Sequence, residues 1–144
     1  MSSELTITTE KSRLDRELIH RFLREDSYWA RNIPRDLMDV AIENSLTFGA
    51  FDGERQVGFA RVVTDYAVFA YVGDVFVLPE YRGRGVSKQL MQAIREHPAL
   101  QRLRRWHLLT RDAHGLYRQF GFRELESPER HMEIAKKDAY GVSS

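Results

Sequence analysis

The segment YRGRGVSK, residues 81–88, combines two glycines and three basic side chains directly before an apolar helical stripe. Gly83 and Gly85 can adopt a positive φ and let the backbone approach an anion closely. Arg82, Arg84 and Lys88 add positive charge, and the segment contains no acidic residue. Because a helix N-terminus also leaves backbone N–H groups unpaired, this pattern predicts a phosphate-binding turn. The alternative is a surface turn whose arginines are only solvated.

Two common phosphate-binding loops do not match this turn. The sequence has no G-x-x-x-x-G-K-[ST] segment, which is the pattern of a P-loop. It has no complete G-x-G-x-x-G segment either, because Lys88 occupies the third glycine position. The turn is therefore neither a P-loop of the usual kind nor the usual dinucleotide-binding fingerprint.

A second segment, AHGLYRQFGF at residues 113–122, combines with this turn into a family resemblance. The turn fits R-x-x-G-x-[G/A] through Arg82 and Gly85, with Ser87, another small residue, at the last position. The second segment fits A-x-x-L-Y-x-x-x-G-F at every fixed position. Their order and their separation by a helix and a strand fit as well. Over nearly the whole chain, the sequence resembles the GNAT superfamily of acyl-CoA-dependent N-acyltransferases.

This resemblance implies that acetyl-CoA is the co-substrate and that the pyrophosphate of CoA lies on the backbone amides of the turn. It implies that pantetheine runs as a pseudo-strand beside the strand before the turn. A backbone N–H of Phe76 or Val77 would then stabilise the oxyanion. The cofactor-binding residues that the resemblance implies are Val75, Phe76, Val77, Arg82, Gly83, Arg84, Gly85, Val86, Ser87, Asp112 and Tyr117.

The resemblance also implies catalytic roles for two side chains. Tyr117 is the tyrosine of the second segment, and a phenol with a pKa of about 10 can give a proton to the leaving CoA thiolate. The alternative is that Tyr117 packs with Phe120 and Phe122. Asp74, just before the pantetheine-pairing residues, is the candidate for binding a cationic amine or taking its proton through a water. The alternative for Asp74 is an exposed or capping carboxylate.

The acceptor pocket is expected between the first two helices, a region that often walls the pocket in proteins of this kind. The segment SYWARNIP places an aromatic pair, Tyr28 and Trp29, beside a proline. Asp36 and Asp74 add acidic groups that favour a cationic acceptor, such as a primary amine of a small molecule or peptide. A packed loop around Tyr28 and Trp29 is the alternative.

These residues have to be positioned by an alternation of strands and helices. Apolar residues spaced by three and four predict a first helix over residues 12–25, capped by Ser12, and a second helix over residues 35–45. Asp52-Gly53 indicates a hairpin turn between two strands. The further predictions are strands at 5–9, 69–77, 103–110, 122–126 and 131–135, a helix from Val86 and a helix over 113–120. The fold expected with the resemblance is mixed α/β, with a splayed, mostly antiparallel sheet of six to seven strands flanked by about four helices.

The length and composition of the chain limit the classes of protein to which it can belong. At 144 residues we expect one domain, residues 1–144, with residues 136–144 as a loose tail. The absence of cysteine excludes disulfides and thiolate metal sites and fits a reducing, cytoplasmic location. His20, His97 and His131 are too scattered in sequence to indicate a metal site. No apolar run approaches the roughly 20 residues that span a bilayer, and we expect no signal peptide or membrane partner.

The sequence therefore predicts an acetyl-CoA-dependent N-acetyltransferase acting on a small-molecule or peptide amine. The alternative is a non-catalytic acetyl-CoA-binding sensor on the same fold. Nucleic-acid binding through LQRLRRWH and RGRG is a third reading, and the net charge of +1 argues against it. The resemblance is also compatible with a homodimer.

Overall fold

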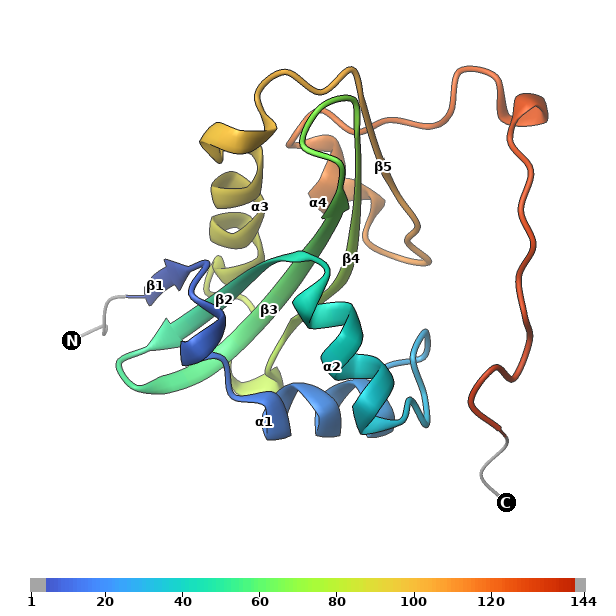
Figure 1. Ribbon diagram of the computed structural model, residues 1–144. Helices are drawn as coiled ribbons and strands as arrows, with labels where there is room; N and C mark the ends of the chain where they lie inside the picture. The colour runs from blue at the N-terminus through green and yellow to red at the C-terminus, as the bar shows by residue number, and fades with distance from the viewer. Residues whose placement is uncertain (1–4, 142–144) are drawn as a thin grey trace.

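The computed structural model describes residues 5–141 and is built on one five-stranded sheet in the order β1-β2-β3-β4-β5 (Figure 1). Neighbouring strands are antiparallel except for β4 and β5, which are parallel. The strands are β1 (Leu5–Thr8), β2 (Leu46–Asp52), β3 (Arg55–Thr64), β4 (Phe69–Val77) and β5 (Arg105–Leu108). The helices are α1 (Arg16–Arg21), α2 (Arg35–Glu43), α3 (Val86–Glu96) and α4 (His114–Arg118). The expected mixed fold is confirmed, with fewer strands than the six to seven predicted.

The core lies where α3 crosses the sheet. α3 packs against β1, β2, β3 and β4, and its buried side chains recur at the spacing of one helix face. Those side chains are Val86, Leu90, Met91 and Ile94. On β2 and β3, Phe48 and Phe59 are fully buried. The rings of Phe22 and Phe76 stack at 4.1 Å and join the helical turn after α1 to β4. The C-terminal end of β4 is thereby packed against the first helical region.

The first helix begins later than predicted, and Ser12 is not its cap. Residue 12 lies in a 3-10 turn, Lys11–Arg13. α1 begins after Asp15, whose Oδ1 accepts a hydrogen bond from the N–H of Leu18 at 3.1 Å. A carboxylate at this position satisfies one unpaired N–H and favours the positive end of the helix dipole, which a serine three residues earlier cannot do.

Asp15→Ala is therefore expected to lower the free energy of unfolding by about 1 kcal/mol, the usual value of an N-cap. The backbone N–H of Asp15, which donates to Gln56 Oε1 at 2.7 Å, is unchanged by the substitution. Urea denaturation followed by circular dichroism measures the effect. Ser12→Ala is the matched control and is expected to leave the midpoint unchanged. An equal loss in both variants would show that the capping contact of Asp15 is not the cause.

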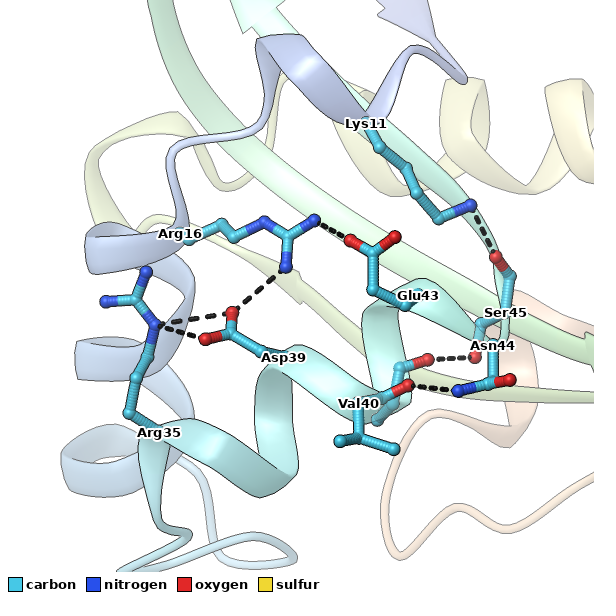
Figure 2. Close-up of polar contacts among 9 residues, drawn as sticks. Lys11, Arg16, Arg35, Asp39, Val40, Glu43, Asn44 and Ser45 are labelled. Carbon is cyan, nitrogen blue, oxygen red and sulfur yellow. Dashed lines mark hydrogen bonds and ion pairs between the residues drawn. The ribbon is translucent and has the colours of Figure 1, made fainter.

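Ion pairs hold α2 against α1 and fix the chain where it enters β2 (Figure 2). Arg16 Nη1 donates to Asp39 Oδ1 at 3.0 Å, and its other terminal nitrogen pairs with Glu43. Arg35 Nε lies 3.2 Å from Asp39 Oδ2. The two guanidinium groups keep the pKa of the Asp39 carboxyl below its usual value, chiefly through the hydrogen bond from Arg16. These contacts position the turn that carries Ser45, whose hydroxyl accepts a hydrogen bond from Arg61 on β3.

The prediction of two closing strands, at residues 122–126 and 131–135, is wrong. Neither segment is a strand within the described residues, and β5 keeps one edge without a strand partner. Instead, every residue from 128 to 141 is exposed, and the chain runs clear of the sheet along one flank (Figure 1). Apolar and polar residues alternate in these segments. Alternation would place the apolar side chains on one face of a strand, but it does not determine whether a neighbouring strand is available for pairing. The described part of the expected tail, residues 136–141, lies on this exposed segment, and residues 142–144 lie outside the described range.

Between residues 5 and 141, no helix has the length and apolar character needed to cross a bilayer.

Candidate active site

β4 parts from β5 halfway along its length. The two strands pair only from Phe69 to Val72 of β4, so the remaining residues of β4 have no strand partner on that edge. On the other edge, Phe76 faces Phe59 whereas Gly73 faces Arg61, so β4 carries one extra residue between these pairs. Asp74 lies in this bulge with a φ of 53°. The bulge bends the strand and leaves an open edge from residue 73 to residue 77.

The predicted phosphate turn follows this edge directly. Gly83 and Gly85 both have a φ of 79°, and Gly85 is the N-cap of α3. Within the described residues, the backbone N–H groups from Gly83 to Ser87 make no hydrogen bond. Residues 82–85 are exposed, whereas Val86 is buried and anchors the turn. The turn is thus a row of free donors at the positive end of a helix, as an anion site requires.

Tyr81 fixes the shape of the turn from one side. Its hydroxyl donates to Asp52 Oδ2 at 2.5 Å, and this hydrogen bond raises the pKa of the phenol. The guanidinium of Arg84 lies 4.9 Å from the centre of the Tyr81 ring. Arg82 Nε donates to the carbonyl of Val77 at 3.3 Å. The two arginines are therefore held at the turn by neighbours rather than only by solvent.

A cleft of about 680 Å³ lies beside the open edge of β4. It collects five residues that the sequence singles out from four separate segments of the chain. They are Tyr28, Trp29, Asp74, Asp112 and Tyr117. Val75 lines the cleft as well. Asp36 is placed elsewhere, exposed on the first turn of α2 and outside the residues that line the cleft.

Asp74 is held from both sides in this cleft. Trp29 Nε1 donates to Asp74 Oδ1 at 2.7 Å, and Arg61 Nε donates to Asp74 Oδ2 at 2.5 Å. Arg61 is fixed in turn by its Nη1, which donates to Ser45 Oγ at 3.1 Å. The Asp74 side chain is only 11% exposed. Its carboxylate is thus a pre-oriented group rather than a solvated or capping one.

Several residues of the cleft were missed in the sequence, and four of them carry charged or phenolic side chains. Arg61 had one visible signal, a single charge inside the apolar strand sequence QVGFARVV. Arg111 gave none, yet its backbone N–H donates to the Tyr28 hydroxyl at 3.2 Å and its guanidinium lies 3.8 Å from the centre of that ring. Tyr71 and Tyr140 also line the cleft. Tyr140 comes from the exposed C-terminal segment, which periodicity could not place.

Tyr117 lies on α4 with its ring turned toward the cleft. Burial raises its pKa to about 12, and the neighbouring Tyr28 and Asp112 add to the shift. Its hydroxyl makes no hydrogen bond within residues 5–141, and its ring contacts Phe122 edge-on at 6.1 Å. The phenol therefore stays protonated at neutral and alkaline pH and has a free O–H. It can donate a proton to a group that enters the cleft.

The cleft offers no metal centre of its own, since the described residues include no cluster of three or more histidine and carboxylate side chains.

Comparison with known proteins agrees with this arrangement. The family model described as an acetyltransferase (GNAT) domain matches residues 43–124, more than half of the chain. A protein of Gibberella zeae named as an acetyltransferase is 31% identical over 133 residues, covering 77% of this chain and 74% of its own length. A solved structure from Xanthomonas campestris pv. campestris, described as a GNAT-family acetyltransferase, is 51% identical. It covers 99% of this chain and all of its own chain, with a TM-score of 0.95.

A more distant structure shows the same fold with a ligand bound. AAC(6')-Iy, solved with the bisubstrate analogue CoA-S-monomethyl-acetylneamine, is 22% identical with a TM-score of 0.65. It covers 94% of this chain and 99% of its own. The family match, the Gibberella relative and the Xanthomonas structure lead to one assignment: the chain belongs to the GNAT family of acetyltransferases.

Proposed function

We propose that this chain transfers the acetyl group of acetyl-CoA to a primary amine of a small molecule or peptide. The amine attacks directly while both substrates are bound. The observation that carries the proposal is the open edge of β4, which lines the cleft that holds Tyr117 and is followed in the chain by the free amides of residues 83–87.

The residues present fit acetyl-CoA. Unpaired N–H groups at the start of α3 suit a pyrophosphate, and Gly83 and Gly85 have no side chain to obstruct it. The unpaired edge from Val75 to Val77 can hydrogen-bond the amides of pantetheine, as an added strand would. Asp112 lines the same cleft as Val75 of this edge. Acetyl-CoA supplies the activated thioester, and the chain supplies its position.

One backbone group is favoured as the oxyanion donor. The N–H of Leu78 donates to the carbonyl of Val57 on β3 at 2.9 Å. Because N–H groups of successive strand residues point to opposite edges, the N–H of Val77 faces the open edge and that of Phe76 faces β3. We therefore assign the oxyanion contact to Val77. This donor is fixed by the sheet before the reaction begins, so it needs no reorganisation.

Proton transfers complete the reaction. The amine nitrogen forms a bond to the thioester carbon, and the carbon–sulfur bond breaks. Tyr117 gives its proton to the thiolate sulfur, and the amine loses a proton to water or to Asp74. Both Asp74 oxygens already accept a hydrogen bond but keep further lone pairs for the amine or a bridging water. Holding the two substrates together supplies much of the remaining acceleration.

Asp74→Asn is expected to reduce kcat/KM for the amine by about 100-fold, at the lower end of general acid–base effects. The amide keeps the size of the side chain but loses the charge that faces Arg61 and the amine. The KM for acetyl-CoA should stay unchanged. Steady-state kinetics with the amine as the varied substrate measure both values. Asp36→Asn is the matched control outside the cleft, and an equal loss in that variant would contradict the role of Asp74.

The function itself is tested by mixing the purified protein with acetyl-CoA and a panel of amines and peptides, and by following release of the free CoA thiol. The chain contains no cysteine, so the protein adds no thiol background. Thiol release that requires an amine, together with an acetylated product by mass spectrometry, is expected. Acetyl-CoA binding without turnover on any amine would favour the sensor instead.

A further inference from the structure

A row of four side chains crosses the cleft from Asp74 to Arg111. Trp29 Nε1 donates to Asp74 Oδ1 at 2.7 Å, and the ring of Trp29 meets the ring of Tyr28 edge-on with a centroid distance of 5.0 Å. The guanidinium carbon of Arg111 lies over the Tyr28 ring, 3.8 Å from its centre. All four residues line the cleft. The row therefore has a carboxylate at one end, a guanidinium at the other and two aromatic rings between them.

Arg111 is held in this position by two contacts with the same tyrosine. Its backbone N–H donates to the Tyr28 hydroxyl at 3.2 Å, and its guanidinium lies against the ring of that residue. The turn that carries Arg111 is fixed further by Thr110, whose Oγ1 accepts a hydrogen bond from the N–H of Ala113 at 3.0 Å. Because the side chain is already held, it loses little conformational freedom when a ligand binds.

The N–H groups of the Arg111 guanidinium remain available to a ligand. Within residues 5–141 this guanidinium makes no ion pair and no hydrogen bond, since its contact is with the face of a ring. Asp112, the next residue in the chain, lines the same cleft without pairing with it. A guanidinium presents parallel N–H groups that match the two oxygens of a carboxylate. Arg111 is therefore suited to bind a carboxylate in the cleft.

The charges of the cleft disfavour an acceptor with several positive groups. Its charged lining consists of Arg61, Asp74, Arg111 and Asp112. Asp74 already pairs with Arg61, whose Nε donates to Asp74 Oδ2 at 2.5 Å. The lining thus has no excess of acidic groups with which to attract a polycation. One ammonium group near Asp74 and one carboxylate at Arg111 would keep the charges of the cleft balanced.

We propose that the acceptor is a free amino acid, a small molecule that carries both a primary amine and a carboxylate, and that Arg111 binds the carboxylate. This inference rests on the proposed function and specifies its acceptor. The amine lies near Asp74, and the body of the substrate packs on Tyr28 and Trp29, which are 45% and 42% exposed in the free protein. The bonds that form and break are those already described, and the products are an N-acetylated amino acid and CoA.

Matched pairs of acceptors test the inference. Each pair consists of an α-, β- or γ-amino acid and its carboxamide, and kcat/KM is measured for both members with acetyl-CoA at saturation. In Arg111→Gln, the ratio of the carboxylate value to the carboxamide value is expected to fall by between about 10-fold and about 100-fold, the range for a hydrogen bond to a charged group. Arg111→Lys should restore part of the ratio. The members of a pair also differ in amine basicity, but that difference cancels when one pair is compared between variants.

Arg102→Gln is the matched control for this experiment. Arg102 is exposed on the turn between α3 and β5 and does not line the cleft, so its replacement should leave the ratio at the wild-type value. If Arg111 only supported the structure, Arg111→Gln would lower kcat/KM equally for both members of a pair, and that result would overturn the inference. Faster acetylation of a peptide with aspartate as its second residue than of every free amino acid would overturn the assignment to a free amino acid.

Binding of a carboxylate can also be measured without turnover. Phenylacetate and phenylacetamide are titrated separately, with CoA present to compete for the turn at residues 82–87. A Trp106→Phe background leaves Trp29 as the only tryptophan, so its fluorescence reports on the cleft. Phenylacetate is expected to bind about 10-fold or more tightly than phenylacetamide, and Arg111→Gln should remove this difference. Equal binding of the two compounds before that substitution would overturn the carboxylate site.

The two measurements separate the failure of this inference from the failure of the proposed function. Acetylation of amines with ratios that do not depend on Arg111 would overturn the inference and leave the function intact. Binding of phenylacetate that depends on Arg111, without acetylation of any amine, would refute the proposed function and the acceptor together and would retain only the carboxylate site.

Discussion

Gly85→Glu is expected to weaken acetyl-CoA binding by about 1,000-fold or more, which corresponds to about 4 kcal/mol. Two effects combine at this residue. Its φ of 79° is a conformation that costs a residue with a side chain roughly 1–2 kcal/mol. The new carboxylate would also lie among the N–H groups that we assign to the pyrophosphate, and like charges brought together at a binding site cost several kcal/mol.

Gly53→Glu separates these two effects. Gly53 also has a positive φ, 61°, and open space where a Cβ would lie, but it occupies the hairpin turn between β2 and β3. The two variants should lose similar stability, whereas only the change at Gly85 should abolish binding. Calorimetric titration with acetyl-CoA and with CoA measures this difference. Wild-type affinity in the Gly85 variant would show that the phosphates bind elsewhere, and no binding by the folded wild type would refute the cofactor assignment.

Tyr117→Phe is expected to lower kcat by between about 100-fold and 10,000-fold while the affinity for acetyl-CoA stays the same. The phenol hydroxyl makes no hydrogen bond within the described residues, so phenylalanine preserves the packing and removes only the proton donor. Tyr66→Phe, at an exposed tyrosine on the turn between β3 and β4, is the control and should keep full activity. Unchanged turnover in the Tyr117 variant would assign the residue to packing alone.

The raised pKa of Tyr117 gives this prediction a pH signature. With a pKa of about 12, the phenol keeps its proton up to strongly alkaline pH, so wild-type kcat should not fall between pH 8 and pH 10. Stability behaves differently. The unfolded chain loses this proton near pH 10, before the folded chain does, so the free energy of unfolding should decrease as pH rises from about 10 to about 12. The phenylalanine variant should lack that part of the alkaline loss.

The sequence predicted most of the structural features that depend only on residues close together in the chain. The Asp-Gly turn gave the β2–β3 hairpin, and the glycines before Val86 gave a turn of positive φ at the start of α3. The helix cap was mistaken, because Ser12 and Asp15 are both good caps and only packing decides which one begins the helix. The closing strands failed for a related reason. Whether residues 122–126 and 131–135 pair depends on a partner edge, which alternation does not specify.

In the candidate site, too, features set by nearby residues were predicted and a contact between distant residues was not. Tyr28, Trp29, Asp112 and Tyr117 were predicted from their segments and lie together in the cleft. The resemblance could not indicate Arg61, since its function is to hold Asp74, and that contact depends on the register shift between β3 and β4. A residue that acts through another side chain carries no sequence signal until the fold brings the two together.

The parting of β4 from β5 means that the sheet is unfinished in the free protein. Acetyl-CoA bound as we propose would hydrogen-bond to this open edge in place of a missing strand, so it would be a structural component of the fold as well as a reactant. In the proposed reaction, each turnover would release the cofactor from this edge, and a new molecule of acetyl-CoA would occupy it again. By mass action, a low concentration of acetyl-CoA would then leave the folded chain less stable as well as slower to turn over.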